Sequence, residues 1–392
     1  MVIELKVGIL RIVSSLHDHN VIDNNTSLFI SSIEEKLNLK LEFITLDEVK
    51  KYDLVLTLIQ SGGSENQFKK MYKELPKPYL LLTYGSNNSL AASMEILSFL
   101  HNLRLEGEIL HGSISYISQR IKHHLYSKKK NYQRLGVIGR PSDWLISSNV
   151  DYSFVKEKLG IELVNISLNE LVDNYKKISD KDSKLDFEYN FKNDEVKNAK
   201  NLYNALVKIK DDYSLNGLTL RCFSLLNKIK TTGCLGLALL NKEGITATCE
   251  GDIPTMLSMH ICNLVMGNPG FQANPSRIDL DNGEIVFAHC TIPLNMISSP
   301  TLMTHFESGI GVALRGDLDL TKVTVFKLGS DLKSYFVETG EIIQNLKEDN
   351  LCRTQIKIKM NNLESFLTNP KGNHHVIIYG DYKQALIDFL EK

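Results

Sequence analysis

The stretch GITATCEGDIPTMLSMH, residues 244–260, joins a short apolar run to two acidic residues and then to a helix-like segment. The run at 245–248 predicts a buried strand, and Asp252 followed by Pro254 is typical of a helix start. Glu250 lies between these two elements, where open α/β sheets bind their ligands. A carboxylate at the end of a buried strand needs a partner or a metal ion, so Glu250 is the first candidate functional residue.

The residues before this stretch alternate between short apolar runs and amphipathic segments. Strands are predicted at 6–13, 41–44, 54–59, 79–83 and 108–111, with helices at 26–37, 65–75 and 88–105 and a further helix ending near 126. The alternation restarts in RLGVIGRPSDWLI (134–146), followed by strands at 162–166, 218–220 and 245–248 and a helix at 194–210. This pattern predicts parallel sheets with helices on both faces.

After about residue 275 the sequence changes to short β-rich runs separated by turn residues, such as EIVFAHCTI and KVTVFKLG. These runs predict a small antiparallel barrel or sandwich. We therefore expect an α/β domain at 1–130, a second α/β domain at 131–275 and a β-rich domain at 276–392. The basic stretch SKKKNYQR at 127–134 is interpreted as a solvated linker.

The composition is that of an ordinary globular protein, with 43% hydrophobic and 23% charged residues among 392. The formal net charge of −1 argues against nucleic acid or an anionic membrane as a partner. No apolar run reaches the length needed to cross a bilayer. The six cysteines form no C-x-x-C pair, and charged residues interrupt the apolar N-terminus, so we expect reduced thiols in a cytoplasmic protein.

Further oxygen and imidazole donors lie in or beside the predicted strands and turns of the last third. They are Asn274 in GFQANPSRID, His289 in IVFAHCTIP, His305 in THFESG, and His374 with His375 in GNHHVIIYGD. Carboxylate oxygen combined with one or two imidazoles suits Mn²⁺, Mg²⁺ or Co²⁺ better than a structural zinc. His305 and its neighbour Glu307 have an alternative interpretation as part of an exposed glycine-flanked loop.

Two other candidates for substrate binding have a structural alternative. Asp252 is fully explained as the N-cap of the helix that follows it. Trp144, the only tryptophan, lies in the loop GRPSDWL after a predicted strand, where an aromatic ring can stack on a substrate. The alternative for Trp144 is packing at a domain junction.

The ordered set CEGD, GFQANPSR, AHCTIP and GNHHVIIYGD resembles the C-terminal half of the L-fucose isomerase and L-arabinose isomerase superfamily, and in particular its shorter fucose-isomerase-like branch. The resemblance covers about residues 135–392, and the first third resembles the family only in its α/β pattern. It implies two Rossmann-like domains followed by a β-barrel-like domain, in trimers or hexamers with active sites between subunits.

The resemblance also implies an activity and a set of site residues. The family converts aldoses to ketoses at a divalent ion, usually Mn²⁺. By position, Glu250 corresponds to a carboxylate that is both metal ligand and acid/base, and His374 to the C-terminal histidine ligand. His289 falls near a histidine that the arabinose branch uses, where the fucose branch differs.

Asn274 departs from the family, because it occupies the position of the second carboxylate. An asparagine can coordinate a metal through its carbonyl oxygen, but it adds no charge and cannot move a proton. Either Glu250 carries out both proton transfers, or Asp252, Asp279 or Glu307 replaces the missing acid. The sequence does not rank these three residues.

The leading hypothesis is therefore a Mn²⁺-dependent aldose–ketose isomerase acting on a pentose, deoxyhexose or related sugar. Glu250 would be base and metal ligand, with Asn274, His289 and His374 completing or bordering the ion. One alternative is a sugar-binding or regulatory relative without catalysis, which the asparagine at 274 motivates. The other is a metal-dependent sugar epimerase or aldolase, which stabilises the same ene-diolate.

Overall fold

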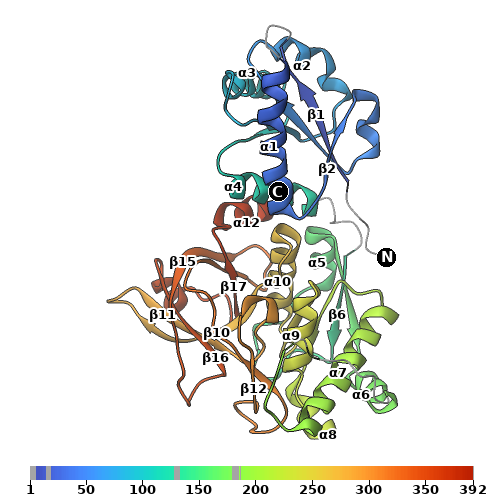
Figure 1. Cartoon of the computed structure of the whole chain (residues 1–392). Helices are drawn as coiled ribbons and strands as arrows, with labels where there is room; N and C mark the ends of the chain where they lie inside the picture. Colours follow the sequence, from blue (N-terminus) through green and yellow to red (C-terminus); the bar gives the residue numbers. More distant parts are fainter. Residues whose placement is uncertain (1–5, 15–18, 128–132, 179–184, 186, 392) are drawn as a thin grey trace. The chain divides into compact units, whose positions relative to one another are not determined.

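The computed structural model describes residues 6–14, 19–127, 133–178, 185 and 187–391. The chain divides into two compact units, one up to residue 128 and one from residue 129 onward. Figure 1 shows the helices and strands of each unit along the chain.

The first unit is built on a five-stranded parallel sheet in the order β2-β1-β3-β4-β5. Its strands are β1 (Val7–Ile12), β2 (Leu41–Ile44), β3 (Leu54–Ile59), β4 (Tyr79–Leu82) and β5 (Gly107–Leu110). Every residue of β3 and β4 is buried, because the central strands of a parallel sheet are covered on both faces.

Helices cover both faces of this first sheet. Buried residues of α1 (His19–Leu37) and α4 (Ile114–Ser127) pack on one face, and those of α2 (Glu65–Met71) and α3 (Ser89–Asn102) pack on the other. The predicted helix at 65–75 is interrupted, since its last turn is the 3₁₀ segment η2 (Tyr72–Glu74). A second 3₁₀ segment, η1 (Leu46–Lys51), connects β2 to β3.

The second unit starts with a four-stranded parallel sheet in the order β7-β6-β8-β9. The strands are β6 (Gln133–Ile138), β7 (Ile161–Ile166), β8 (Gly217–Leu220) and β9 (Thr246–Cys249). The helices are α5 (Tyr152–Leu159), α6 (Leu168–Lys177), α7 (Asn193–Asp212), α8 (Phe223–Ile229) and α9 (Cys234–Lys242). The sequence predicted only α7 among these five helices.

Six antiparallel strands of the same unit close into a barrel in the order β10-β11-β16-β15-β14-β17. They are β10 (Phe271–Asp279), β11 (Glu284–His289), β14 (Lys322–Leu328), β15 (Tyr335–Asn345), β16 (Thr354–Met360) and β17 (His375–Tyr379). Phe271, Phe287 and Ile377 are among the buried residues of the barrel core. The shorter elements are η4 (Leu294–Met296), β12 (Thr301–Met303), β13 (Ala313–Arg315), α11 (Glu364–Thr368) and α12 (Lys383–Leu390).

Helix α10 (Ile253–Met266) connects the parallel sheet to the barrel. It contacts β8 and β9 of the sheet and β10, β14 and β17 of the barrel, and Figure 1 shows it between these two parts of the second unit. All of its residues except Asn263 are buried, as expected for a helix that is apolar all round. The turn that starts α10 therefore lies where the sheet and the barrel meet.

The predicted fold class is confirmed: parallel α/β sheets are followed by a β-rich part, which is the barrel rather than the sandwich of the two forms considered. The predicted domain boundary after residue 275 falls inside β10. Residues 128–132 of the stretch interpreted as a linker lie outside the described residues. Among the described residues, no helix has the length and apolar character that crossing a membrane requires.

Candidate functional site

Glu250 lies in a tight turn between β9 and α10. Glu250 and Gly251 both adopt left-handed backbone conformations, with φ of 65° and 70°. The backbone N–H of Ser142 donates to the Glu250 carbonyl at 2.9 Å, and the N–H of Gly251 donates to the carbonyl of Leu220 at 3.0 Å. A non-glycine residue held at positive φ costs on the order of 1–3 kcal/mol, and such strain concentrates at functional sites. Two backbone hydrogen bonds to other segments thus hold this strained turn.

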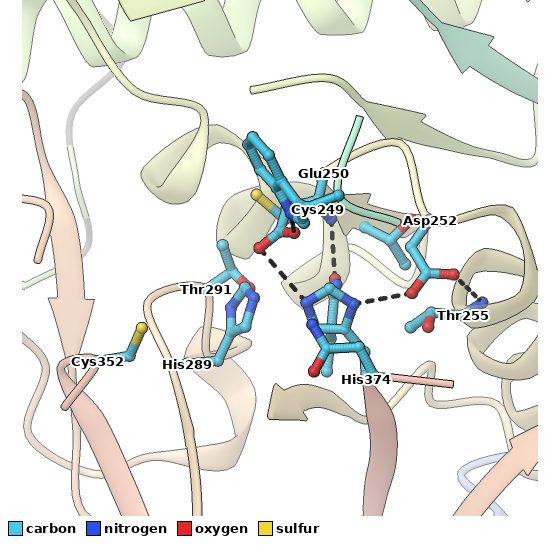
Figure 2. A network of polar contacts seen from close by, with 12 residues as sticks. Cys249, Glu250, Asp252, Thr255, His289, Thr291, Cys352 and His374 are labelled. Carbon is cyan, nitrogen blue, oxygen red and sulfur yellow. Dashed lines mark hydrogen bonds and ion pairs between the residues drawn. The ribbon is translucent and has the colours of Figure 1, made fainter. Parts of the chain in front are cut away.

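Three buried side chains from distant parts of the chain converge beyond this turn. One ligand atom each of Glu250, His289 and His374 lies within 4.8 Å of the others. Glu250 follows β9, His289 ends β11, and His374 directly precedes β17. The two imidazole rings are 5.3 Å apart and inclined at 70°. Figure 2 shows the three side chains pointing toward one another.

Neighbouring groups fix the orientation of each of these side chains. The Trp144 indole N–H donates to Glu250 Oε2 at 2.7 Å, while Glu250 Oε1 lies 3.5 Å from His374 Nε2. The Thr291 hydroxyl oxygen lies 2.7 Å from His289 Nδ1. His374 Nδ1–H donates to Asp252 Oδ2 at 2.8 Å. Both histidines therefore have Nδ1 engaged, which leaves Nε2 as the nitrogen for a ligand.

Asp252 has two functions at this point in the fold. Its Oδ1 accepts from the Thr255 backbone N–H at 3.0 Å, so the predicted N-cap is present. Its Oδ2 holds His374, and the ammonium of Lys327 lies 3.5 Å from Oδ1. Asp252 and His374 are fully buried, and Lys327 is 1% exposed. The side chain of Asp252 is thus buried and engaged with Thr255, His374 and Lys327, and its predicted contact with a substrate stays a prediction.

These contacts change the pKa values of the site. Burial acts to raise the pKa of Glu250, but the hydrogen bond and charge of His374, with further contributions from His289 and Trp144, lower it to about 2. Burial acts to lower the pKa of His374, yet Asp252 and Glu250 raise it to about 9. Burial lowers the pKa of His289 to about 3. Glu250 is therefore ionised and His289 neutral at neutral pH.

Two buried polar atoms at this place, His374 Nε2 and Asn274 Oδ1, lack a well-formed hydrogen bond among the described residues, and the nearest charged group to His374 Nε2 is Glu250 Oε1 at 3.5 Å. Asn274 is half-buried on β10. It pairs with Ala288, next to His289, while Ala273 pairs with His375, next to His374. A buried donor or acceptor without a partner is costly unless a ligand satisfies it. Carboxylate, two imidazoles and an amide oxygen together fit a divalent cation.

The structure places the two predicted aromatic candidates at the edge of this cluster. The Trp144 ring is half-exposed and packs edge-on against Phe223 at 4.9 Å, and Phe223 in turn contacts the His305 ring at 5.3 Å. His305 is buried, so the interpretation of His305 as an exposed loop residue is wrong. Its ring nitrogens lie 3.0 Å from Ser308 Oγ and 3.1 Å from Glu307 Oε2.

The three acids considered as substitutes for a second carboxylate lie in different surroundings. Asp279 accepts from Asn282 in the β10–β11 hairpin, five residues along β10 from Asn274, or about 17 Å at the usual rise of a strand. Glu307 contacts His305 and the thiol of Cys352. Only Asp252 contacts one of the three clustered residues, and there it bonds to His374.

Sequence reasoning missed Lys327, Thr255 and Thr291. Lys327 was detectable in principle, because KVTVFKL is an apolar strand in which every residue after Lys322 is buried. A lysine at such a position needs a buried anionic partner. Thr255 and Thr291 carry no comparable signal, since buried threonines are common in strands and helices.

Comparison with known proteins gives distant relatives. No family model matches the chain. The chain is 23% identical over 283 residues to the sulfoquinovose isomerases of Priestia aryabhattai and Priestia megaterium, and these matches cover 67% of the chain and 63% of each relative. A sulfoquinovose isomerase of Clostridium sp. is 27% identical over 200 residues, which are 46% of the chain and 44% of the relative.

The chain thus spans less than two thirds of the length of the relatives that it matches. All three relatives are sugar isomerases by name, which is consistent with the sugar-isomerase superfamily suggested by the sequence. The fucose-isomerase-like branch stays a prediction.

Proposed function

We propose that this chain is an aldose–ketose isomerase that binds a sugar and a divalent cation at the Glu250 cluster. The observation that carries the proposal is the convergence of Glu250, His289 and His374 from three separate strands into one buried group. The names of the three relatives support an isomerase acting on a sugar. Sulfoquinovose is accordingly one candidate substrate, beside a pentose or a deoxyhexose.

Glu250, His289 and His374 would hold the cation, with Asn274 bordering it through Oδ1. When bound, a divalent cation polarises the sugar oxygens and stabilises negative charge on them. The donor set suits Mn²⁺, Co²⁺ or Mg²⁺, and we propose Mn²⁺ first.

Glu250 is the residue we assign to proton transfer. Isomerisation removes a proton from C2 of the aldose while O1 gains one, and the resulting ene-diol then gains a proton at C1 while O2 loses one. Glu250 is ionised at neutral pH and can accept the first proton. Because Asn274 cannot move a proton and Asp252 is engaged with His374 and Thr255, Glu250 would make both transfers on one face of the ene-diol.

Trp144 and His305 are proposed to border the substrate. The half-exposed indole offers an aromatic surface beside Glu250, and its N–H keeps the carboxylate oriented. His305 extends the aromatic contact through Phe223.

We also propose a homo-oligomer with shared sites, as the sequence resemblance implies, which light scattering on the purified protein would test.

Proton NMR in D₂O tests the proposed function directly. A panel of aldoses and ketoses that includes sulfoquinovose would be incubated with protein and Mn²⁺, with a chelator-treated sample as control. We expect a ketose to form from its aldose, and we expect the chelator to abolish this reaction. The product should carry deuterium at the carbon that exchanges its proton. Deuterium exchange without isomer formation would instead indicate an epimerase or aldolase.

The second candidate function is sugar binding without catalysis, which Asn274 favours because it removes one of the two family carboxylates. Tight binding of a sugar in calorimetry, with neither exchange nor turnover under any divalent ion, would support this function and overturn the isomerase.

A further inference from the structure

Lys327 is a buried cation that the proposed reaction does not use. It lies on β14 with 1% of its surface exposed, and its Nζ donates to Thr255 Oγ1 at 2.5 Å and lies 3.5 Å from Asp252 Oδ1. Its stem also lies beside Gly372, in the loop that leads into His374. A fully buried ammonium is costly unless it is paired, so this lysine depends on Asp252.

The contacts of Asp252 divide between its two oxygens. Oδ1 receives the Thr255 backbone N–H and the Lys327 ammonium, and Oδ2 receives only the Nδ1–H of His374 among the described residues. Lys327 and Thr255 therefore fix the carboxylate from one side, and its other oxygen is directed at the imidazole. Once an imidazole has lost its second proton, donation from Nδ1 leaves Nε2 unprotonated and able to bind a ligand.

We propose that Lys327 is a positioning residue that acts through Asp252 to hold the His374 ring with Nε2 directed at the Glu250 cluster. The chain of contacts runs from β14, through the first turn of α10, to the residue before β17. It joins three elements that are far apart in sequence, so the ligand nitrogen is oriented by the packing of α10 on the barrel. This inference rests on the proposed function in one respect, namely that His374 is a metal ligand.

The first test uses Lys327→Met, which keeps the length of the side chain and removes the charge. Trp144 is the only tryptophan and bonds to Glu250, so quenching of its fluorescence by Mn²⁺ reports binding at the cluster. We expect Mn²⁺ affinity to fall about 10- to 100-fold, as is usual when a group that orients a metal ligand is lost. Lys359→Met, on the exposed face of β16, is the matched control and should leave the affinity unchanged.

A double-mutant cycle separates positioning from simple packing. Asp252→Asn keeps the shape of the side chain but places an amide opposite His374 Nδ1, so it also weakens Mn²⁺ binding. If Lys327 acts through Asp252, adding Lys327→Met to Asp252→Asn causes no further loss. Additive losses in the cycle, or a Mn²⁺ affinity of Lys327→Met within twofold of the wild type, would overturn the proposal. The double variant removes the charges of both Lys327 and Asp252, so no unpaired buried charge is left. Its Mn²⁺ affinity can therefore be compared with that of Asp252→Asn even if Lys327→Met alone folds poorly.

A second readout needs neither metal nor turnover. The Nδ1 proton of His374, buried and bonded to Asp252, should appear as a slowly exchanging downfield proton signal that is absent in His374→Gln. We expect its exchange with solvent to accelerate at least tenfold in Lys327→Met. An unchanged exchange rate contradicts the inference. A wild type that shows this signal but no isomerisation contradicts the proposed function alone.

Discussion

At the scale of single residues, the site depends on one carboxylate. Glu250 is the only acid among the three clustered residues, and its two oxygens face Trp144 and His374 separately. The sequence singled out Glu250 because an acid at the end of a buried strand needs a partner. It could not show that Asp252, two residues later, turns inward to His374, because that contact spans 122 positions of the chain.

Glu250→Gln tests this residue with little change in shape. We expect sugar isomerisation to fall by a factor of about 10²–10⁴, the usual contribution of an acid–base group. The affinity for Mn²⁺ should also fall, since the ligand loses its charge. Steady-state kinetics and Trp144 fluorescence measure the two effects. Glu341→Gln, on an exposed part of β15, is the control and should behave as the wild type, whereas full activity in Glu250→Gln would remove Glu250 from the mechanism.

At the scale of elements, the turn between β9 and α10 determines where Glu250 points. The sequence predicted both elements around this turn, from the apolar run before it and from the Asp-x-Pro signal after it. It did not predict that two successive residues take left-handed conformations. Packing adds a second requirement for glycine at 251, because the carbonyl of Arg140 approaches it so closely that only a residue without a side chain fits.

Gly251→Ala is expected to destabilise the second unit. A Cβ at residue 251 would lie 2.5 Å from the Arg140 carbonyl oxygen, and the backbone φ of 70° already disfavours alanine. We expect the free energy of unfolding to fall by about 2–4 kcal/mol. Gly244→Ala is a matched comparison, since φ there is 77° but no atom lies within 4 Å of the added Cβ. Urea unfolding followed by Trp144 fluorescence should show a clearly larger loss for Gly251→Ala, and equal losses would refute the steric argument.

At the scale of the whole molecule, the first unit has its own core and its own partly buried ion pair. Glu108 on β5 accepts from Arg120 Nη2 at 2.8 Å, and His124 Nε2 lies 2.8 Å from its Oε2. Burial acts to raise the pKa of Glu108, but the hydrogen bonds and charges of His124 and Arg120 lower it to about 2. Because the pKa is lowered in the folded state, the ionised carboxylate stabilises folding above its ordinary value of 4.5.

The stability of the first unit should therefore fall as the pH decreases from about 4.5 toward 2. A shift of this size corresponds to roughly 2–4 kcal/mol. Circular dichroism during urea unfolding reports both units, while Trp144 fluorescence reports the second alone. In Glu108→Gln, the fall in the free energy of unfolding that Glu108 causes over this pH range should be absent from the circular dichroism data. The same pH dependence in the variant and the wild type would show that Glu108 is not its source.

Local sequence patterns were enough to predict the fold class and the positions of the candidate ligands along the chain. Alternating apolar runs and amphipathic segments predict parallel sheets, and the β-rich runs after residue 275 predict the antiparallel part, because each pattern is local. Likewise, Glu250, His289 and His374 each stand beside a predicted strand, where residue type and position are enough to notice them.

Which of these candidates lie together in space could be learned only from the folded chain. Closure of the barrel brings the residue before β17 beside the end of β11, and α10 packs both against the sheet that carries Glu250. In the folded chain, Asp279 lies in the β10–β11 hairpin. Asp252 contacts His374 and lies 3.5 Å from the ammonium of Lys327. The contacts of Lys327 with Thr255 and of His374 with Asp252 join residues more than 70 positions apart, and such pairing and burial of charge are encoded by no local pattern.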